Sequence, residues 1–265
     1  IDHIVKFVGV NAEVSMCGNN GDPIYHSKFL ELCQKFKDNN CRLIISTNGS
    51  AKTKAWWEKL KNILNKDDCI KFAIDGLEDT NHLYRKNAKW NTIMSAIETL
   101  KDRNFKIVWK FIVFKHNQHQ IDDARSLSKQ LMFDNFQLTY SDRWLGRTDL
   151  MPDQEYVNDY YQHQKQVLSS TEYSSNMVPA CLKNNLPSDS LYVDSEGDFY
   201  PCCWMGSYRY KYKSVFSPKQ NPFNIKDNTL KQILENKSVK DFFKTTNQFT
   251  SAHECCKIQC GVKNG

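Results

Sequence analysis

Short apolar runs alternate with helical patterns through residues 1–140, and this alternation constrains the fold more than any other feature of the chain. Apolar runs predict strands at 14–17, 42–47, 70–75, 105–114 and 135–140. Segments with apolar residues three and four positions apart predict helices between them, at 29–36, 56–63, 91–100 and 121–131. Strands that alternate with helices form β-α units around a parallel sheet. The sequence therefore predicts an α/β fold.

Polar residues gather at the carboxyl ends of these five predicted strands. In parallel α/β folds, ligands bind along that edge. Helix N-caps also favour Ser, Asn and Asp, so one such turn would mean little. Five turns in succession favour a ligand site over capping alone. The turns are Asn20-Gly21-Asp22, Ser46-Thr47-Asn48, Asp75, Lys115-His116-Asn117 and Ser141-Asp142-Arg143.

Six of the ten cysteines fall in the last third of the chain. They are Cys181, Cys202, Cys203, Cys255, Cys256 and Cys260. Cys202 follows a hairpin-like stretch over 191–201, and Cys260 lies near the end of the sequence. Thiolates brought together from separated segments bind a metal or an iron–sulfur cluster, or they pair as disulfides. By contrast, Cys33 and Cys69 lie among apolar residues and are expected to be buried in the core.

The rest of the sequence narrows these alternatives. It shows no signal peptide and no apolar run long enough to span a membrane, which favours a reducing, cytoplasmic setting and disfavours disulfides. No Cys-x-x-Cys knuckle of the kind zinc prefers is present, so spacing alone leaves iron–sulfur and zinc as equal alternatives. The formal net charge of +6 is mild and mixed along the chain, so neither nucleic acid nor membrane is an expected partner.

Four stretches, in this order, resemble motifs of one family, the radical S-adenosylmethionine (SAM) superfamily. Asn20-Gly21-Asp22-Pro23 resembles its Gly-Gly-Glu-Pro motif, with Asp in place of Glu, and Ser46-Thr47-Asn48-Gly49 resembles its Thr-Asn-Gly motif. The stretch 74–85 resembles its Ser-x-Asp-Gly…Arg segment. The distal cysteines resemble the auxiliary-cluster region called SPASM or, when shortened, Twitch. The resemblance extends from about Val14 to Cys260.

The resemblance implies an incomplete parallel (β/α) barrel over 1–145, a linker helix over 146–175, and a small cysteine-rich SPASM/Twitch-like domain over 176–265. One departure is clear: the family's Cys-x-x-x-Cys-x-x-Cys motif, which binds the catalytic cluster, is absent from these 265 residues. We expect that the sequence lacks its N-terminus, including the first strand and the cluster loop. The alternative is a relic that has lost the radical chemistry.

The resemblance also implies two cofactors, SAM and an auxiliary [4Fe–4S] cluster. Asp22, with Asn20 and Gly21, is expected to receive the SAM ammonium group, and Arg85 its carboxylate, with Asp75 beside it. Ser46, Thr47 and Asn48 are expected to bind the carboxylate or the ribose, and Asn117 the ribose. The alternative for Arg85 is a surface ion pair with Glu78 or Asp79. The expected cluster ligands are Cys181, Cys202, Cys256 and Cys260, with Cys203 or Cys255 as alternatives.

The function implied by the resemblance is that of an enzyme. It would use a 5′-deoxyadenosyl radical to take hydrogen from a peptide, a protein or a small metabolite, with an electron donor as a further partner. The first alternative is a non-catalytic iron–sulfur or zinc module, and the second is a zinc-stabilised interaction domain. A fold does not fix a substrate, and the sequence does not identify one.

Overall fold

The computed structural model of the chain describes residues 2, 4–5, 11–18, 21–139, 147–156, 176–177, 182–183, 186–187, 191–206, 216, 222–246, 248 and 251–262. The chain divides into two compact units. The first comprises Ile1 and Val8–Asn158, and the second comprises Asp2–Phe7 and Asp159–Gly265. No helix among the described residues is long and apolar enough to cross a membrane.

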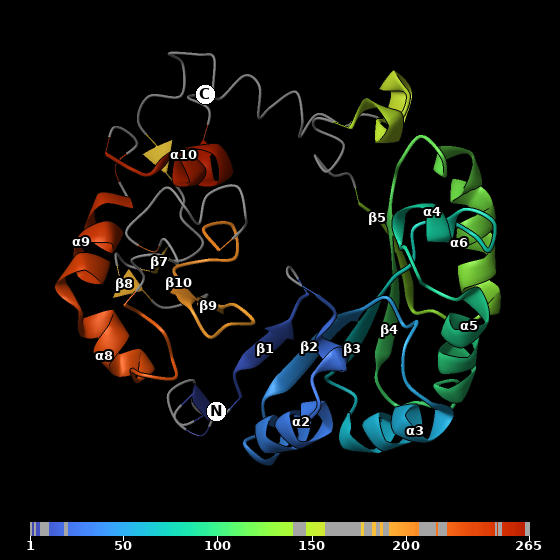
Figure 1. Cartoon of the computed structure of the whole chain (residues 1–265), viewed down its shortest axis with the longest axis horizontal. Helices are drawn as coiled ribbons and strands as arrows, with labels where there is room; N and C mark the ends of the chain where they lie inside the picture. The colour runs from blue at the N-terminus through green and yellow to red at the C-terminus, as the bar shows by residue number, and fades with distance from the viewer. Residues whose placement is uncertain are drawn as a thin grey trace. The chain divides into compact units, whose positions relative to one another are not determined.

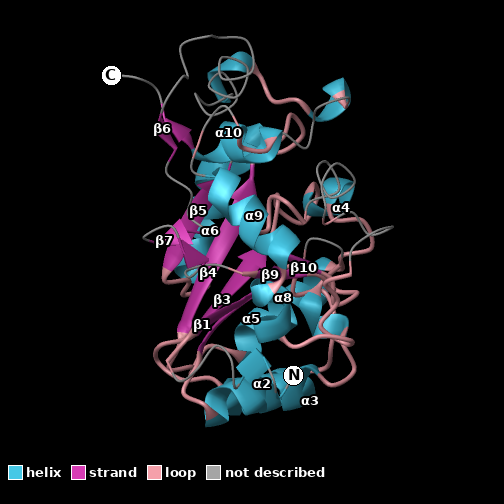
Figure 2. Cartoon of the chain, turned by 90° about the vertical axis from the view of Figure 1, so that its left-hand side faces the viewer, coloured by secondary structure: helices cyan, strands magenta, loops and turns pink. Residues whose placement is uncertain are grey.

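The first unit is built on one sheet of five strands in the order β1-β2-β3-β4-β5 (Figures 1 and 2). Every neighbouring pair is parallel. The central strands β2, β3 and β4 are mostly buried, whereas the edge strands β1 and β5 alternate polar and apolar residues and are partly exposed. The sheet ends at β1 and β5 and does not close, so the α/β fold and the incomplete barrel are confirmed. The strands are β1 Glu13–Met16, β2 Arg42–Thr47, β3 Cys69–Ala73, β4 Lys106–Ile112 and β5 Asn135–Thr139.

Helices follow the strands and lie along the convex side of the curved sheet (Figure 1). Trp57 and Leu60 on α3 are fully buried, and the Thr53 hydroxyl caps that helix by accepting a hydrogen bond from the Trp56 amide. Burying each such side chain contributes about 1.5–3 kcal/mol. The α-helices are α2 Phe29–Asp38, α3 Lys54–Ile63, α4 Asn81–Tyr84, α5 Trp90–Thr99 and α6 Ile121–Gln130. Short 3-10 turns are η1 Pro23–Tyr25, η2 Gln118–Gln120, η3 Thr148–Leu150 and η4 Gln154–Tyr156. Of the predicted linker helix, 146–175, only 147–156 is described, and it contains the turns η3 and η4.

Where the structure describes it, the second unit combines short strand pairs with helices around its own apolar core. Phe199, Tyr200, Phe216, Val239 and Phe243 are buried in that core. The predicted hairpin is confirmed: β9 and β10 pair antiparallel. The strands are β6 Asn176–Met177, β7 Leu182–Lys183, β8 Leu186–Pro187, β9 Tyr192–Val193, β10 Phe199–Tyr200 and β11 Gly261–Val262. The helices are α8 Leu230–Glu235, α9 Lys237–Thr246 and α10 Glu254–Cys260.

Candidate functional site

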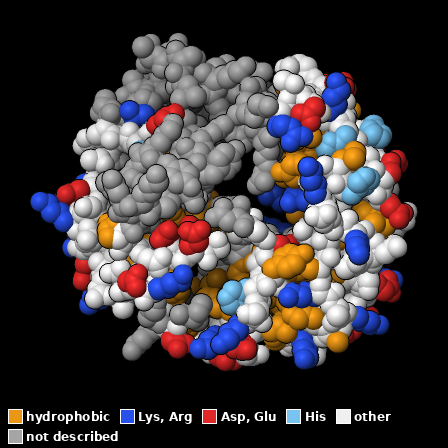
Figure 3. All heavy atoms as spheres, in the orientation of Figure 1, with side chains coloured by type: hydrophobic (Ala, Val, Ile, Leu, Met, Phe, Trp, Pro, Cys, Tyr) orange, Lys and Arg blue, Asp and Glu red, His pale blue; other side chains and the backbone are white. Residues whose placement is uncertain are grey.

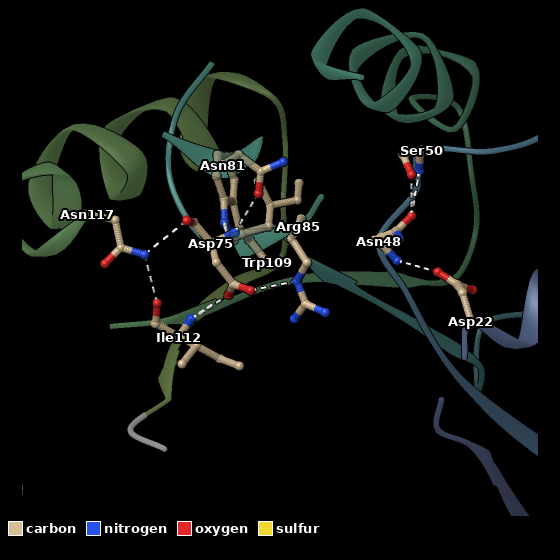
Figure 4. Close-up of polar contacts among 10 residues, drawn as sticks. Asp22, Asn48, Ser50, Asp75, Asn81, Arg85, Trp109, Ile112 and Asn117 are labelled. Carbon is tan, nitrogen blue, oxygen red and sulfur yellow. Dashed lines mark hydrogen bonds and ion pairs between the residues drawn. The ribbon is translucent and has the colours of Figure 1, made fainter. Parts of the chain in front are cut away.

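Asp22 ties the turn after β1 to the end of β2. One carboxylate oxygen accepts the Thr47 hydroxyl at 2.8 Å and the Asn48 amide at 2.7 Å, and the other accepts the Ile24 amide at 3.2 Å (Figure 4). An ionised carboxylate offers about four lone-pair sites. Three are used here, so Asp22 can still accept one hydrogen bond from a ligand. Gly21 beside it is exposed, with a φ of 146° that favours glycine.

The end of β2 presents two side chains with spare hydrogen-bonding capacity. Ser46 is half-buried, and its hydroxyl has no partner in the described part of the chain. The Asn48 side-chain oxygen accepts both the amide and the hydroxyl of Ser50, which leaves its NH₂ group for a ligand (Figure 4). Thr47 differs, because it is buried and its hydroxyl is used within the protein, donating to Asp22 and accepting from Gly49.

Asp75 is a fully buried brace at the end of β3. One carboxylate oxygen accepts the Ile112 amide at 2.7 Å, and the other accepts Nε of Arg85 at 2.6 Å (Figure 4). The Asp75 amide donates to the side-chain oxygen of Asn81 on α4 at 2.9 Å. Asp75 therefore joins β3, β4 and α4, which positions Arg85. Asn81 was missed by the sequence reasoning, because nothing in a four-residue helix signals its contact.

Arg85 pairs with Asp75, so the expected alternative, an ion pair with Glu78 or Asp79, is wrong. Asp79 instead accepts a hydrogen bond from Gln120. The Arg85 side chain is 23% exposed, and its guanidinium lies over the Tyr84 ring, 5.2 Å from the centroid. Its two terminal nitrogens have no hydrogen-bond or ion-pair partner within the described residues. Figure 4 shows the guanidinium between Asp75 and the Asn48 turn. Such a fork, held at Nε and open at its end, suits bidentate recognition of a carboxylate.

Asn117 locks the turn after β4. It is fully buried, and its NH₂ group donates to the carbonyls of Asp75 and Ile112, both at 2.9 Å. Its side-chain oxygen accepts the Phe114 amide at 2.7 Å. Both of its N–H groups are therefore used within the protein. The predicted ribose contact would have to use the remaining acceptor lone pair or another side-chain orientation.

Three histidines lie near the same edge, around α4 and α6 (Figure 3). Burial, and then the neighbouring His119 and His82, lower the pKa of His116, whose ring stacks on Phe114. A lowered pKa keeps the imidazole neutral at neutral pH. No group of three His, Cys, Asp or Glu side chains in the described residues is arranged to hold a metal ion, so these histidines form no metal site.

The cysteines of the second unit occupy a turn and a helix. Cys202 lies in the turn after β10, and Cys255, Cys256 and Cys260 lie on α10. Neither segment is a strand, so neighbouring cysteines do not alternate between two faces as they would on extended backbone. On a helix, residues four apart share a face, so Cys256 and Cys260 can ligate together. Cys255 is buried in the apolar core.

The cysteines of the second unit influence one another's pKa. Burial raises the pKa of Cys202 to about 11, hydrogen bonds from two backbone amides act against the rise, and Cys203 and Cys260 add to it. Burial also raises the pKa of Cys255, with contributions from the same group of cysteines. None of the described cysteines forms a disulfide. Among the predicted site residues, Cys181 and Asn20 lie outside the described residues, as does the turn 141–143.

Two family profiles match the chain. The Radical SAM superfamily profile matches residues 9–127, and that of the iron–sulfur cluster-binding domain SPASM matches residues 181–261. Residues 9–127 belong to the radical SAM superfamily, and residues 181–261 to the SPASM domain family. A comparison with curated proteins gave no match.

Solved radical SAM structures share the fold of the chain. The structure of anSMEcpe with bound AdoMet and Cp18Cys peptide is 14% identical with a TM-score of 0.54, and the match covers 98% of this chain and 78% of that one. SuiB of Streptococcus suis bound to S-adenosylmethionine is 15% identical with a TM-score of 0.58, and the match covers 93% of this chain and 60% of SuiB. SuiB bound to the precursor peptide SuiA is 16% identical with a TM-score of 0.56, and the match again covers 93% of this chain and 60% of SuiB. The chain thus spans less than two thirds of SuiB.

Radical SAM and SPASM domains imply SAM and [4Fe–4S] clusters as cofactors. The described residues of the first unit fit SAM. Asp22 and Arg85 offer opposite charges with unused hydrogen-bonding capacity for the two charged groups of an amino acid. In the second unit the described thiols do not by themselves form a group of three arranged to hold a metal, and Cys181 lies outside the described residues. Cys202 already accepts hydrogen bonds from backbone amides, as cluster-ligating sulfurs do.

Proposed function

We propose that this protein is a radical SAM enzyme that removes a hydrogen atom from a peptide or protein substrate. The observation that carries the proposal is the open Arg85 fork, which Asp75 holds at the carboxyl edge of a radical SAM sheet. The SPASM domain and the peptides bound to anSMEcpe and SuiB support a peptide substrate. When bound, SAM supplies a 5′-deoxyadenosyl radical for this chemistry.

Asp22 and Arg85 at the carboxyl edge of the sheet would each bind the group of SAM that carries the opposite charge. The Asp22 carboxylate receives the SAM ammonium group, and the terminal nitrogens of Arg85 donate to the SAM carboxylate. Ser46 and the Asn48 NH₂ group bind the ribose hydroxyls or the carboxylate. Gly21, with its positive φ, shapes the turn that presents Asp22. Thr47, Asp75 and Asn117 act through other residues, because their side chains are already used to hold the turns.

In the second unit, Cys181, Cys202, Cys256 and Cys260 would hold the auxiliary [4Fe–4S] cluster. Cys256 and Cys260 share a face of α10, and Cys202 is coupled to Cys260. Cys255 is the less suitable neighbour, because its side chain is part of the apolar core. Cys203 is exposed. The amides that contact Cys202 would stabilise its sulfur in the ligated state.

The test of catalysis uses the protein made from the complete coding sequence, purified and reconstituted without oxygen. With SAM and dithionite it should form 5′-deoxyadenosine. Asp22→Asn should weaken SAM binding by about 1.5–3 kcal/mol, the scale of a hydrogen bond to a charged group. Thr47→Val is the matched control, since it removes one hydrogen bond to Asp22 but leaves the charge. If both variants weaken SAM equally in calorimetric titration, Asp22 holds the turn and does not bind SAM.

A second candidate function is a non-catalytic iron–sulfur module. It is favoured by the absence of Cys-x-x-x-Cys-x-x-Cys from these 265 residues. In that case the protein from the complete coding sequence would bind about four iron atoms per chain through the distal cysteines. It would form no 5′-deoxyadenosine. Zinc in place of iron after anaerobic purification would instead favour a zinc-stabilised interaction domain.

A further inference from the structure

A cavity of about 630 Å³ opens at the amino edge of the sheet in the first unit, the edge opposite Asp22 and Asp75. Its lining residues come from the starts of strands: Arg42 begins β2, Lys106 begins β4, and the segment 65–67 precedes β3. The volume is typical of small-molecule sites, roughly 300–1,000 Å³, but such sites are mostly apolar. This one is lined by four cationic side chains, three asparagines, one carboxylate and a cysteine.

Two of the four cations belong to the wall of the cavity. Lys37 forms an ion pair of 2.8 Å with Asp68, which is fully buried, and donates to the Cys41 carbonyl. Arg42 pairs with Glu13 at 2.8 Å, and its Nε donates to the Asp67 carbonyl at 2.8 Å. These two charges are neutralised within the protein, and their side chains are fixed in position.

The other two cations are left without a carboxylate. Neither Lys66 nor Lys106 has an ion-pair partner in the part of the chain that the structure describes, and both are exposed. Asp67 is the one carboxylate in the lining, so positive charge is in excess. A helix dipole accounts for part of this pattern, because Lys66 follows the carboxyl end of α3. It does not account for Lys106, which begins a strand.

We propose that this cavity binds a small anion that carries at least two phosphate groups. Ammonium groups bind phosphate as point charges, and asparagine NH₂ groups supply neutral donors around them. Lys66 and Lys106 would each contact a phosphate group, which is why a multivalent anion suits the cavity better than a single phosphate. Since the cavity lies at the opposite edge of the sheet, its ligand would not compete with SAM.

The test is calorimetric titration of the anaerobically purified full chain with inorganic pyrophosphate at fixed ionic strength. Saturable binding is expected in the parent. The double variant Lys66→Gln/Lys106→Gln should weaken it at least tenfold, the scale of a lost hydrogen bond between charged groups. Lys59→Gln is the matched control, because Lys59 is exposed on α3 outside the cavity. All variants should bind SAM as the parent does, which separates this site from the SAM site.

Three results would overturn the proposal. The first is no saturable binding of pyrophosphate by the parent. The second is equal affinity of the parent and the double variant for pyrophosphate, and the third is equal affinity of the parent for citrate and for pyrophosphate at matched ionic strength. The last would show general attraction of anions in place of phosphate recognition. Thermal unfolding of each variant provides the remaining check. The single variant Lys66→Gln is measured for this purpose: loss of stability with unchanged pyrophosphate affinity would assign that lysine to the α3 dipole and remove it from the site.

Discussion

Replacing Asp75 by Asn should destabilise the first unit by about 2–4 kcal/mol. Asn keeps the volume but turns an NH₂ group toward either the Ile112 amide or Nε of Arg85, which now contact the two carboxylate oxygens at 2.7 and 2.6 Å. A buried donor without an acceptor costs about 1–3 kcal/mol. Breaking a fully buried ion pair costs about 3–5 kcal/mol. Arg85 is 23% exposed, so water recovers part of that second loss.

The assay is hydrogen–deuterium exchange of the β3 and β4 amides, read by mass spectrometry. It reports on the first unit alone, whereas denaturant unfolding would mix two units. The expected loss corresponds to exchange roughly 30- to 1,000-fold faster for amides that exchange by unfolding. Asp102→Asn is the control, since Asp102 is exposed in the turn after α5, and its effect should stay within about 0.5 kcal/mol.

A double-mutant cycle with Arg85→Gln isolates the pair. If the Asp75–Arg85 ion pair stabilises the unit, the two substitutions together should destabilise it by less than the sum of their separate effects. Unchanged exchange at β3 and β4 in Asp75→Asn would refute the reasoning, because it would mean that the buried carboxylate contributes nothing to holding the strand ends together.

Three further predictions concern other parts of the fold. Gly49→Ala should destabilise the first unit by about 2–4 kcal/mol in the same exchange assay, because Gly49 has a φ of 68° and an added Cβ would lie 2.7 Å from the buried Phe72 ring. Burial alone would raise the pKa of Asp134, but hydrogen bonds, the largest from Arg103, lower it overall. The stability that ionised Asp134 contributes is therefore fully present above the unfolded pKa of about 3.9 and is lost as the pH falls through the lower folded pKa. Asp134→Asn should speed amide exchange in the first unit at pH 7, relative to the parent at the same pH, and this effect should shrink as the pH falls below about 3.9. Thr229→Ala should remove the capping box of α8, cost about 1 kcal/mol, and speed exchange in α8 while leaving the first unit unchanged.

The sequence predicted the sheet well because β2 and β3 contain short apolar runs and β1 and β5 alternate polar and apolar residues, and both patterns are typical of strands. It missed α4, which is four residues long, and α10, whose cysteines and polar residues show no apolar period. The sequence predicted where the polar site lies, but not which of its side chains bond within the protein and which remain open to a ligand. Thr47 and Asn117 hold turns, whereas Ser46 and Arg85 keep free donors. This difference depends on contacts between strands, which the local sequence does not show. A partner such as Asp68 for Lys37, 31 residues away, is set by the fold and leaves no local signal.

The hydrogen bonds that Asp22, Asp75 and Asn117 make within the protein have a consequence for affinity. Each ties one turn of the carboxyl edge to a neighbouring strand without help from a ligand. Binding normally costs about 0.5–1.5 kcal/mol for each flexible side chain that it immobilises. At this edge the backbone of the turns and the Nε end of Arg85 are ordered during folding. Much of that entropic cost is therefore met before a ligand arrives, and the affinity of the edge should depend more on its few free donors than on any closing motion of the turns.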